Sequence, residues 1–191
     1  MASHDKITWR WLLLLIVVFT GVFFTTRYFV ANDIVSGNSM QPTLQSGQRL
    51  LSLKHKLPHR FDIIVLDAPD HAGSLYIKRV IGMPGDTVAV KNDQLYLNGR
   101  KQAEPYLKTA FAKRELAQYQ KAYQVKHFTT NFDLRHLKAT QTIKVPAHSY
   151  FVMGDNRPIS NDGRAFGYIT QAQVESVIIW RYWPLSTVKV L

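Results

Sequence analysis

Cysteine is absent from this chain of 191 residues. Its absence excludes disulfide bonds, thiolate metal ligands and a cysteine nucleophile. The seven histidines show neither the His-x-x-x-His nor the His-Glu-x-x-His spacing that is typical of metal sites. We therefore expect a protein without a metal site and without any other cofactor.

Acidic residues are also scarce, because 13 Asp and Glu face 24 Lys and Arg, giving a net charge of +11. Apolar residues make up 46% of the chain and charged residues 19%, which excludes a disordered polymer. The excess of positive charge favours anionic lipids or anionic wall polymers as neighbours. Nucleic acid is the other usual partner of a basic protein, but no zinc finger, RNP-type motif or basic zipper is present, and we predict no nucleic-acid binding.

An apolar segment near the N-terminus predicts a membrane span at residues 11–31. It carries one charge, Arg27, and at about 1.5 Å per residue it would extend about 32 Å, close to the ~30 Å of a hydrocarbon core. Trp9, Trp11 and Tyr28 stand at its two ends, where interfacial aromatic residues are expected. A cleaved signal peptide is the alternative, but no small-x-small cleavage site follows and the segment is long for one.

The expected organisation has three parts. Residues 1–10 form a short cytoplasmic N-terminus, because Lys6 and Arg10 favour the cytoplasmic side. Residues 11–31 form a single transmembrane helix in the cell membrane. Residues 32–191, about 160 residues, are enough for one extracytoplasmic domain.

The remainder of the chain has the pattern of a β protein. Turn signals separate short apolar or β-branched runs, and Asn92-Asp93 predicts the turn of a hairpin over residues 87–97. No alternation of strands and helices is visible, which disfavours a parallel sheet. The predicted strands are Arg49–Leu53, Asp62–Leu66, Leu75–Ile81, Thr87–Val90, Gln94–Leu97, Ser149–Met153 and Val174–Trp183.

Residues 105–140 interrupt this pattern. They carry seven basic and two acidic residues and few strand signals, which predicts an insertion with a short helix near Ala112–Tyr123. The insertion is interpreted either as a solvated surface element or as a contact site for anionic envelope material.

Three polar blocks carry the chemistry. Ser39 lies in Ser-Gly-Asn-Ser-Met-Gln-Pro-Thr-Leu (36–44), Lys78 lies in Tyr-Ile-Lys-Arg-Val-Ile-Gly-Met-Pro-Gly-Asp (76–86), and Gly-Asp-Asn-Arg-Pro-Ile-Ser-Asn-Asp-Gly-Arg-Ala-Phe-Gly occupies 154–167. A serine hydroxyl is a poor nucleophile until a base removes its proton. A lysine can be that base only where an apolar surrounding lowers its pKa, and the flanking Tyr, Ile and Val residues could provide one.

In order and spacing, these blocks resemble type I signal peptidases in the short, single-anchor form of Gram-positive bacteria. The resemblance covers nearly the whole chain. It implies a mostly β fold: an antiparallel β-sheet catalytic domain with a small inserted subdomain, preceded by one N-terminal transmembrane helix. It also implies a membrane-bound serine endopeptidase in which Ser39 is the nucleophile and Lys78 the general base.

The resemblance assigns further roles to the third block and its surroundings. Ser160 occupies the position of a serine that orients the lysine, and the Ser39 backbone N–H is the family's oxyanion donor. Some members add a hydroxyl two residues before the nucleophile; here Gly37 stands there, so a backbone donor is expected. Gly154 and Gly163 are interpreted as tight-turn positions. The residues expected to hold the loop around the site are Arg79, Asp155, Arg157, Asp162 and Arg164.

Some positions depart from the family pattern, namely Pro158, Ile159 and Gly163.

Family substrates carry small residues one and three positions before the cut. By position, the expected pocket lining is Val35, Met40, Leu44, Val65, Tyr76 and Ile77, each of which could equally be an ordinary core residue. The implied partners are the signal peptides of secreted preproteins and the phospholipid membrane, with the translocation machinery as a further candidate.

Other interpretations stay open at this point. A Ser-His-Asp triad could be formed by Ser39, His148 and Asp155. An autoprotease related to the self-cleaving repressor domains would share the serine–lysine pair, although such proteins lack an anchor. A non-catalytic anchored module could bind preproteins, translocation machinery or wall polymers through its basic insertion.

Overall fold

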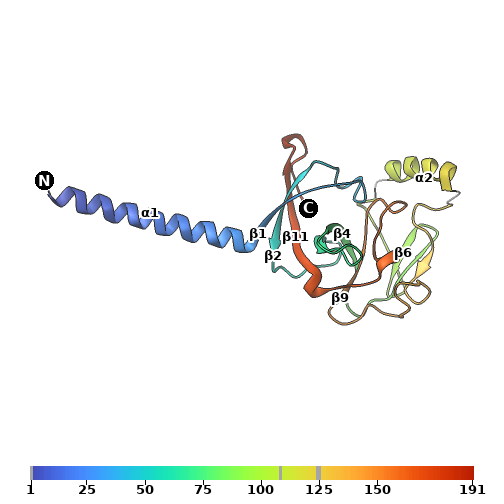
Figure 1. Cartoon of the computed structure of the whole chain (residues 1–191). Coiled ribbons are helices and arrows are strands. Elements are labelled where there is room, and N and C mark those ends of the chain that lie inside the picture. Colours follow the sequence, from blue (N-terminus) through green and yellow to red (C-terminus); the bar gives the residue numbers. More distant parts are fainter. Residues whose placement is uncertain (1, 108, 124–125) are drawn as a thin grey trace.

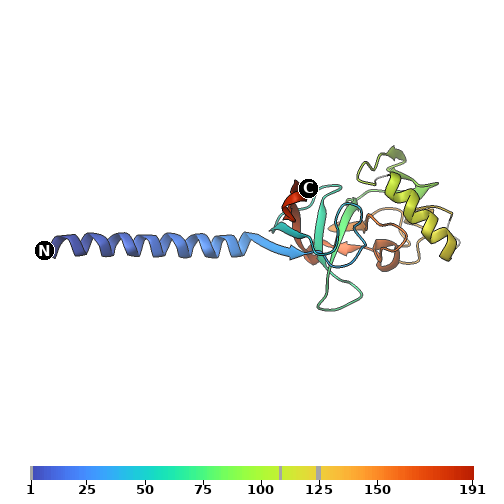
Figure 2. The same cartoon turned by 90° about the horizontal axis from the view of Figure 1, so that it is seen from above.

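A long N-terminal helix and a β-rich body make up the structure, a computed structural model that describes residues 2–107, 109–123 and 126–191. The helix, α1 (Ala2–Phe29), projects from the body and joins it at its C-terminal end, as the perpendicular views in Figures 1 and 2 show. Its segment Trp9–Phe29 has a mean hydropathy of 2.0 and is exposed along its length, apart from contacts of its last residues with Lys54 and His55. By length and composition it is the one described helix that could cross a bilayer.

Helix α1 ends two residues before the predicted end of the span at residue 31. Strand β1 (Val30–Ile34) follows at once, and its Val30 and Ala31 pair with Leu53 and Ser52 of the next strand. Pairing with that strand satisfies the backbone in place of a further helical turn, although both side chains would suit a membrane helix. The ammonium of Lys54 donates a hydrogen bond to the Arg27 carbonyl (3.3 Å), which covers one free carbonyl of the helix end.

The other elements lie in the body. The helices are α2 (Thr109–Tyr123) and α3 (Gly163–Phe166), and 3-10 turns span Gln171–Gln173 and Leu185–Thr187. The strands after β1 are β2 (Arg49–Lys54), β3 (Ile63–Asp67), β4 (Leu75–Gly82), β5 (Val88–Lys91), β6 (Gln94–Leu97), β7 (Arg100–Gln102), β8 (Phe132–Asp133), β9 (Ser149–Met153), β10 (Ile169–Thr170), β11 (Val174–Trp183) and β12 (Lys189–Val190).

Two antiparallel sheets are formed by these strands. The larger has the order β1-β2-β11-β3-β4-β9-β10, with β12 beside β11. The smaller has the order β7-β6-β5-β8. In the larger sheet Ile64 pairs with Lys78 and Val65 with Ile77, and this register fixes where the Lys78 side chain emerges. Strand β9 pairs with β4 only from Arg79 onward, so the stretch Leu75–Lys78 has one edge unpaired among the described residues.

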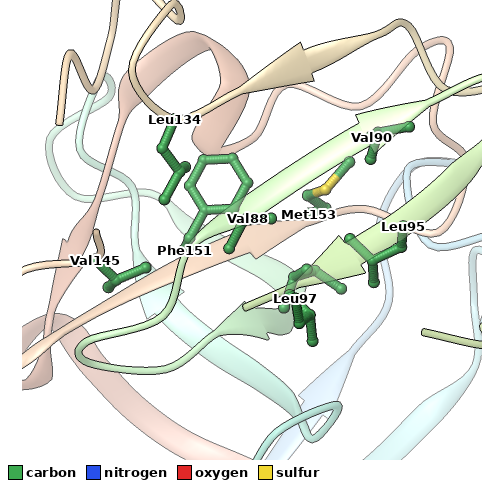
Figure 3. Close-up of a cluster of buried hydrophobic side chains, with 9 residues drawn as sticks. Val88, Val90, Leu95, Leu97, Leu134, Val145, Phe151 and Met153 are labelled. Carbon is green, nitrogen blue, oxygen red and sulfur yellow. The ribbon is translucent and has the colours of Figure 1, made fainter. Parts of the chain in front are cut away.

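One hydrophobic cluster joins the two sheets (Figure 3). Phe151 and Met153 of β9 lie among side chains of β5 and β6, and both are fully buried. Since burial of apolar surface is the main favourable term in folding, this cluster holds the small sheet against the large one. Its remaining buried members are Ile81, Val88, Val90, Leu95, Leu97, Leu134 and Val145.

The predicted fold class, mostly antiparallel β with one apolar N-terminal helix, is confirmed. Three strands coincide with their predicted ranges, Gln94–Leu97, Ser149–Met153 and Val174–Trp183, and the hairpin turns at Asn92 and Asp93 with φ of 50° and 62°. Strands β1, β7, β8, β10 and β12 were not predicted. They are two to five residues long, which is too short for a recognisable hydrophobic pattern.

The predicted insertion at residues 105–140 is part of a larger unit. Its helix, α2, begins at Thr109 rather than Ala112, and its strand β8 completes the small sheet that starts at Val88. Phe111 of α2 packs edge-on against Phe128, with ring centroids 6.5 Å apart. This contact holds a helix whose other face is basic and exposed.

Candidate active site

Ser39 lies in the loop between β1 and β2, at the edge of the large sheet. The loop is closed at its base, where the Val35 N–H donates to Gln48 O (2.9 Å). Met40 and Leu44 anchor it from below, since both are almost completely buried in a hydrophobic cluster of the large sheet. The Ser39 carbonyl accepts a hydrogen bond from Asn156 N–H (2.9 Å), so the third polar block holds the turn from the other side.

Lys78 reaches this turn from the middle of β4. Its Nζ lies 3.1 Å from Ser39 Oγ, within hydrogen-bonding distance. The two residues are 39 positions apart in the chain, and the pairing of β4 with β3 brings them together. The predicted serine and lysine are therefore neighbours in space.

The surroundings of Lys78 favour its neutral form. The side chain is 4% exposed, and among the described residues it forms no salt bridge. Burial lowers its pKa from the ordinary 10.5 to about 8, while the more distant carboxylates of Asp162 and Asp70 raise it and partly oppose the effect. A substantial fraction of the amine is therefore unprotonated near pH 8 and can accept the proton of the Ser39 hydroxyl.

Arg79, the next residue on β4, is held by a carboxylate. Its Nε and Nη2 donate to the two oxygens of Asp155 at 2.8 and 2.6 Å, and its guanidinium stacks on the ring of Tyr106 at 4.0 Å from the centroid. Thr43, four residues after the serine, donates its hydroxyl proton to the same carboxylate. Arg79 and Asp155, both expected to hold the loop around the site, thus do so as a pair.

The other two arginines of the third block fix its shape. Arg164 pairs with Asp162, whose carboxylate also accepts the Gly154 N–H (3.0 Å) and caps α3. Although Asp162 is fully buried, these hydrogen bonds and the charge of Arg164 keep its pKa below the usual range. Arg157 is completely buried and pairs with Glu104 of the small sheet's unit, not with an acid of its own block.

Ser160 lies against Gly154, and its buried hydroxyl forms no hydrogen bond with Lys78 or with any other described residue. A Cβ on Gly154 would lie 2.1 Å from Ser160 Oγ and 2.6 Å from the Ser39 carbonyl oxygen. The interpretation of Gly154 and Gly163 as tight-turn positions is therefore corrected: neither has a positive φ, and at each a side chain would strike neighbouring atoms.

A cleft of about 480 Å³ opens in front of Ser39 and Lys78. Five of the six predicted lining residues lie along it: Val35, Met40, Val65, Tyr76 and Ile77. Leu44 does not, because its side chain points into the core and is fully buried. Gly37 also lines the cleft, and its φ of +83° is a backbone conformation that side chains rarely allow.

Two backbone N–H groups of this loop, those of Gly37 and Ser39, face no acceptor among the described residues. Unpaired N–H groups at a cleft are available to a ligand oxygen.

Several residues of the site were not predicted. Thr43 lay inside the serine block without an assigned role. Glu104 directly precedes the predicted insertion and Tyr106 lies within it, and no pattern indicated their contacts with Arg157. The loop before β4 reaches the third block through Asp70, whose carboxylate accepts a hydrogen bond from Asn161 (2.6 Å) at the rim of the cleft. Only the fold brings these segments together.

The alternative Ser-His-Asp arrangement is not formed. Asp155 is occupied by Arg79 and Thr43, and His148 lies exposed in the turn before β9, where its side chain makes no hydrogen bond to the described residues. The basic side chain beside Ser39 is that of Lys78.

Comparison with known proteins gives a consistent result. The sequence profile of the family described as signal peptidase, peptidase S26, matches residues 8–183. Signal peptidase IB of Staphylococcus aureus (strain Mu50 / ATCC 700699) is 35% identical over 184 residues, which are 94% of this chain and 92% of that protein. Signal peptidase I V of Bacillus subtilis (strain 168) is 44% identical over 148 residues, 75% of this chain and 80% of the relative.

A solved structure is similar as well. The crystal structure of a signal peptidase I from Enterococcus faecalis V583 is 45% identical in sequence and superimposes with a TM-score of 0.55. The match covers 64% of this chain and 97% of that one.

Replacing Lys78 by methionine should stabilise the fold at neutral pH. The folded-state pKa of about 8 lies below 10.5, so folding disfavours the protonated amine, and native stability should rise with pH between about 8 and 10.5. We expect Lys78→Met to be more stable at pH 7 by about 1–3 kcal/mol, with the gap closing towards pH 10. Denaturant unfolding in detergent micelles at several pH values measures this.

The exposed Lys113→Met provides the matched control and should change stability by less than about 0.5 kcal/mol at each pH. A Lys78→Met variant that is less stable than the native chain at pH 7 and keeps its pH dependence would contradict the burial argument.

Gly154→Ala should destabilise the protein by about 1–3 kcal/mol, because the new methyl group overlaps Ser160 and the Ser39 carbonyl. Adding Ser160→Ala should recover only part of the loss, since the backbone clash stays. Gly21→Ala, whose methyl group meets nothing within 4 Å, is the control and should be close to neutral. Equal unfolding midpoints for Gly154→Ala and Gly21→Ala would refute the close approach.

Proposed function

The chain belongs to the signal peptidase family, peptidase S26, and from that premise we propose that it is a membrane-anchored serine endopeptidase that removes signal peptides from secreted preproteins. Membership of the family makes it a peptidase. The observation that carries the finer proposal is the 3.1 Å approach of Lys78 Nζ to Ser39 Oγ at a buried site where the pKa of the lysine is lowered to about 8.

The proposed mechanism uses one base twice. Lys78 takes the proton of the Ser39 hydroxyl as Oγ attacks the scissile carbonyl carbon, and it then gives that proton to the departing amine. The signal peptide is left as an ester on Ser39. In the second half Lys78 removes a proton from water, which attacks the ester and restores the serine. A lysine can perform both steps only if it starts neutral, which its burial favours.

The negative charge on the carbonyl oxygen needs donors aimed at its position. We propose the backbone N–H groups of Ser39 and Gly37 for this role, because both line the cleft and neither has an acceptor within the described chain. The φ of +83° at Gly37 supports this, since it suits a glycine whose backbone rather than side chain is used.

The substrate would lie extended along β4. The edge of Leu75–Lys78 is free of pairing on the cleft side among the described residues, and an extended peptide can add to such an edge through its main chain. Alternate side chains of the peptide would then face the cleft lining, where Val35, Val65 and Ile77 provide an apolar surface. A shallow apolar lining fits small residues before the cut.

Ser160 is proposed to orient Lys78. Its hydroxyl is buried and unpaired among the described residues, and it adjoins the turn that carries Ser39 through Gly154. A hydrogen bond with Lys78 Nζ would give this hydroxyl the partner that buried polar groups normally have.

The proposed location is the cell membrane, with α1 as a single-pass anchor, the N-terminus in the cytoplasm and the β-rich body outside. The length and hydropathy of Trp9–Phe29 support a span, and the basic Lys6 and Arg10 support this orientation. Preproteins emerging from the translocation machinery would then meet the cleft beside the membrane.

The detergent-solubilised chain should cleave a preprotein with an Ala-x-Ala site after the second alanine, and Ser39→Ala should lower the rate at least about 10³-fold because the nucleophile is lost. Mass spectrometry of the products locates the cut. Ser46→Ala, an exposed hydroxyl in the same loop, is the control and should cleave at the native rate. Equal cleavage by the Ser39→Ala variant, or no cleavage by a folded native chain with lipid present, would count against the proposal.

The dependence of kcat/KM on pH should show an ascending limb near pH 8, because the base acts only when Lys78 is neutral. Ser160→Ala should lower the plateau of kcat/KM at least about tenfold, because a misoriented base loses part of its 10²–10⁴-fold effect. The ascending limb should stay near pH 8, because the burial of Lys78 is unchanged. A flat profile would argue against Lys78 as the base, and an unaltered plateau would remove Ser160 from the mechanism.

A further inference from the structure

A second cavity lies where α1 enters the β-rich body. It has a volume of about 370 Å³ and lies between the last turn of α1 and the strands β1 and β2. Its lining consists of Thr26, Arg27, Val30, Ala31, Asn32 and Lys54. The cavity thus combines two cations with an amide and a small apolar wall.

Several polar groups of this cavity have donors that are not used in hydrogen bonds to the described residues. Among the described residues, the Arg27 guanidinium makes no hydrogen bond or ion pair, and the Asn32 amide makes none either. The Lys54 ammonium uses one of its three donors on the Arg27 carbonyl. The nearest acid on these strands, Asp33, is hydrogen-bonded to Ser52 and forms no salt bridge with either cation.

The position of the cavity along α1 corresponds to a membrane surface. Trp9–Phe29 at about 1.5 Å per residue spans about 31 Å, which matches a hydrocarbon core of about 30 Å. Arg27 and Lys54 then lie at the level of the headgroups. Tyr28 stacks on His55, with ring centroids 4.6 Å apart, so the helix end is held against β2 and the cavity keeps its shape.

We propose that this cavity binds the phosphodiester of an anionic phospholipid headgroup, with Arg27 and Lys54 as the charged ligands and Asn32 as a further donor. Both cations line the same cavity and carry several N–H donors, which suits phosphate oxygens. A lipid is favoured over a soluble phosphate because the cavity opens beside the end of the anchor and its wall includes Val30 and Ala31. The inference rests on α1 being the membrane anchor of the proposed function.

The site adjoins the catalytic cleft. Asn32 lines both cavities, and the residues that follow it on β1, Asp33 and Ile34, continue along the cleft towards Ser39. A headgroup held at Arg27 and Lys54 would therefore lie next to the place where a signal peptide leaves the bilayer and enters the cleft.

The test compares lipid binding by the full-length chain in micelles of an uncharged detergent, read by native mass spectrometry. Phosphatidylglycerol and phosphatidylcholine with the same acyl chains are the probes. We expect the native chain to retain one phosphatidylglycerol in preference to phosphatidylcholine. The Arg27→Gln/Lys54→Gln variant should bind it about 30-fold more weakly, since each cation near an anionic lipid contributes about fivefold.

Two matched variants separate this site from net charge and from misfolding. Lys113→Gln/Lys121→Gln removes the same charge from the exposed face of α2 and should bind like the native chain. Arg27→Lys/Lys54→Arg keeps both cations and should retain most of the affinity. Equal binding by the Arg27→Gln/Lys54→Gln variant and the native chain, or an equal loss in the α2 variant, would overturn the site.

Free glycerol phosphate and inorganic phosphate distinguish the source of the phosphate. Neither should displace phosphatidylglycerol when supplied at the lipid's concentration, and displacement by either would overturn the lipid as occupant. Ser39→Ala should bind phosphatidylglycerol like the native chain, so this result does not depend on turnover. A chain that cleaves preproteins but shows no preference for phosphatidylglycerol would refute this site alone and leave the proposed function standing.

Discussion

The ion pair between Arg79 and Asp155 joins the three segments that supply the site. Arg79 belongs to β4 beside Lys78, Asp155 opens the third polar block, and Thr43 adds a hydrogen bond from the loop that carries Ser39. The Asp155 side chain is completely buried and that of Arg79 is 8% exposed. Loss of either partner would leave a buried charge uncompensated, which costs several kcal/mol, so the pair constrains the relative positions of Ser39 and Lys78.

Lys78 and Arg79 are neighbours on β4 and both are buried, but burial affects the two side chains differently. Adjacent side chains on a strand point to opposite faces, so Lys78 faces the cleft and Arg79 the interior. Arg79 keeps its charge because a carboxylate holds it in two hydrogen bonds, and a guanidinium does not lose its proton in proteins. Lys78 has no such partner among the described residues, and desolvation therefore determines its state. The arrangement favours a neutral Lys78 without weakening the loop around it.

The sequence predicted the parts of this site that are encoded in short blocks. Ser39 and Lys78, and Arg79 and Asp155 as residues that hold the loop, were found because the order and spacing of the blocks resemble a known family. Strands with clear periodicity, such as β6, β9 and β11, were found with correct bounds. The contact of Arg157 with Glu104 was not, since it depends on how the small unit docks on the large sheet, and no local pattern encodes docking. Leu44 was misassigned because an apolar residue near a site looks the same whether it faces the cleft or the core.

No linker separates α1 from β1, so the distance from the end of the helix to the loop that carries Ser39 is fixed. The helix ends at Phe29 and the strand starts at Val30, and the five residues of that strand cover about 16 Å before the loop that carries Ser39. With α1 as the proposed anchor, the height of Ser39 above the bilayer is set by the fold and not by a flexible tether. A signal peptide would then place its scissile bond at Ser39 only if the extended chain between the end of its hydrophobic segment and that bond is long enough to match this height.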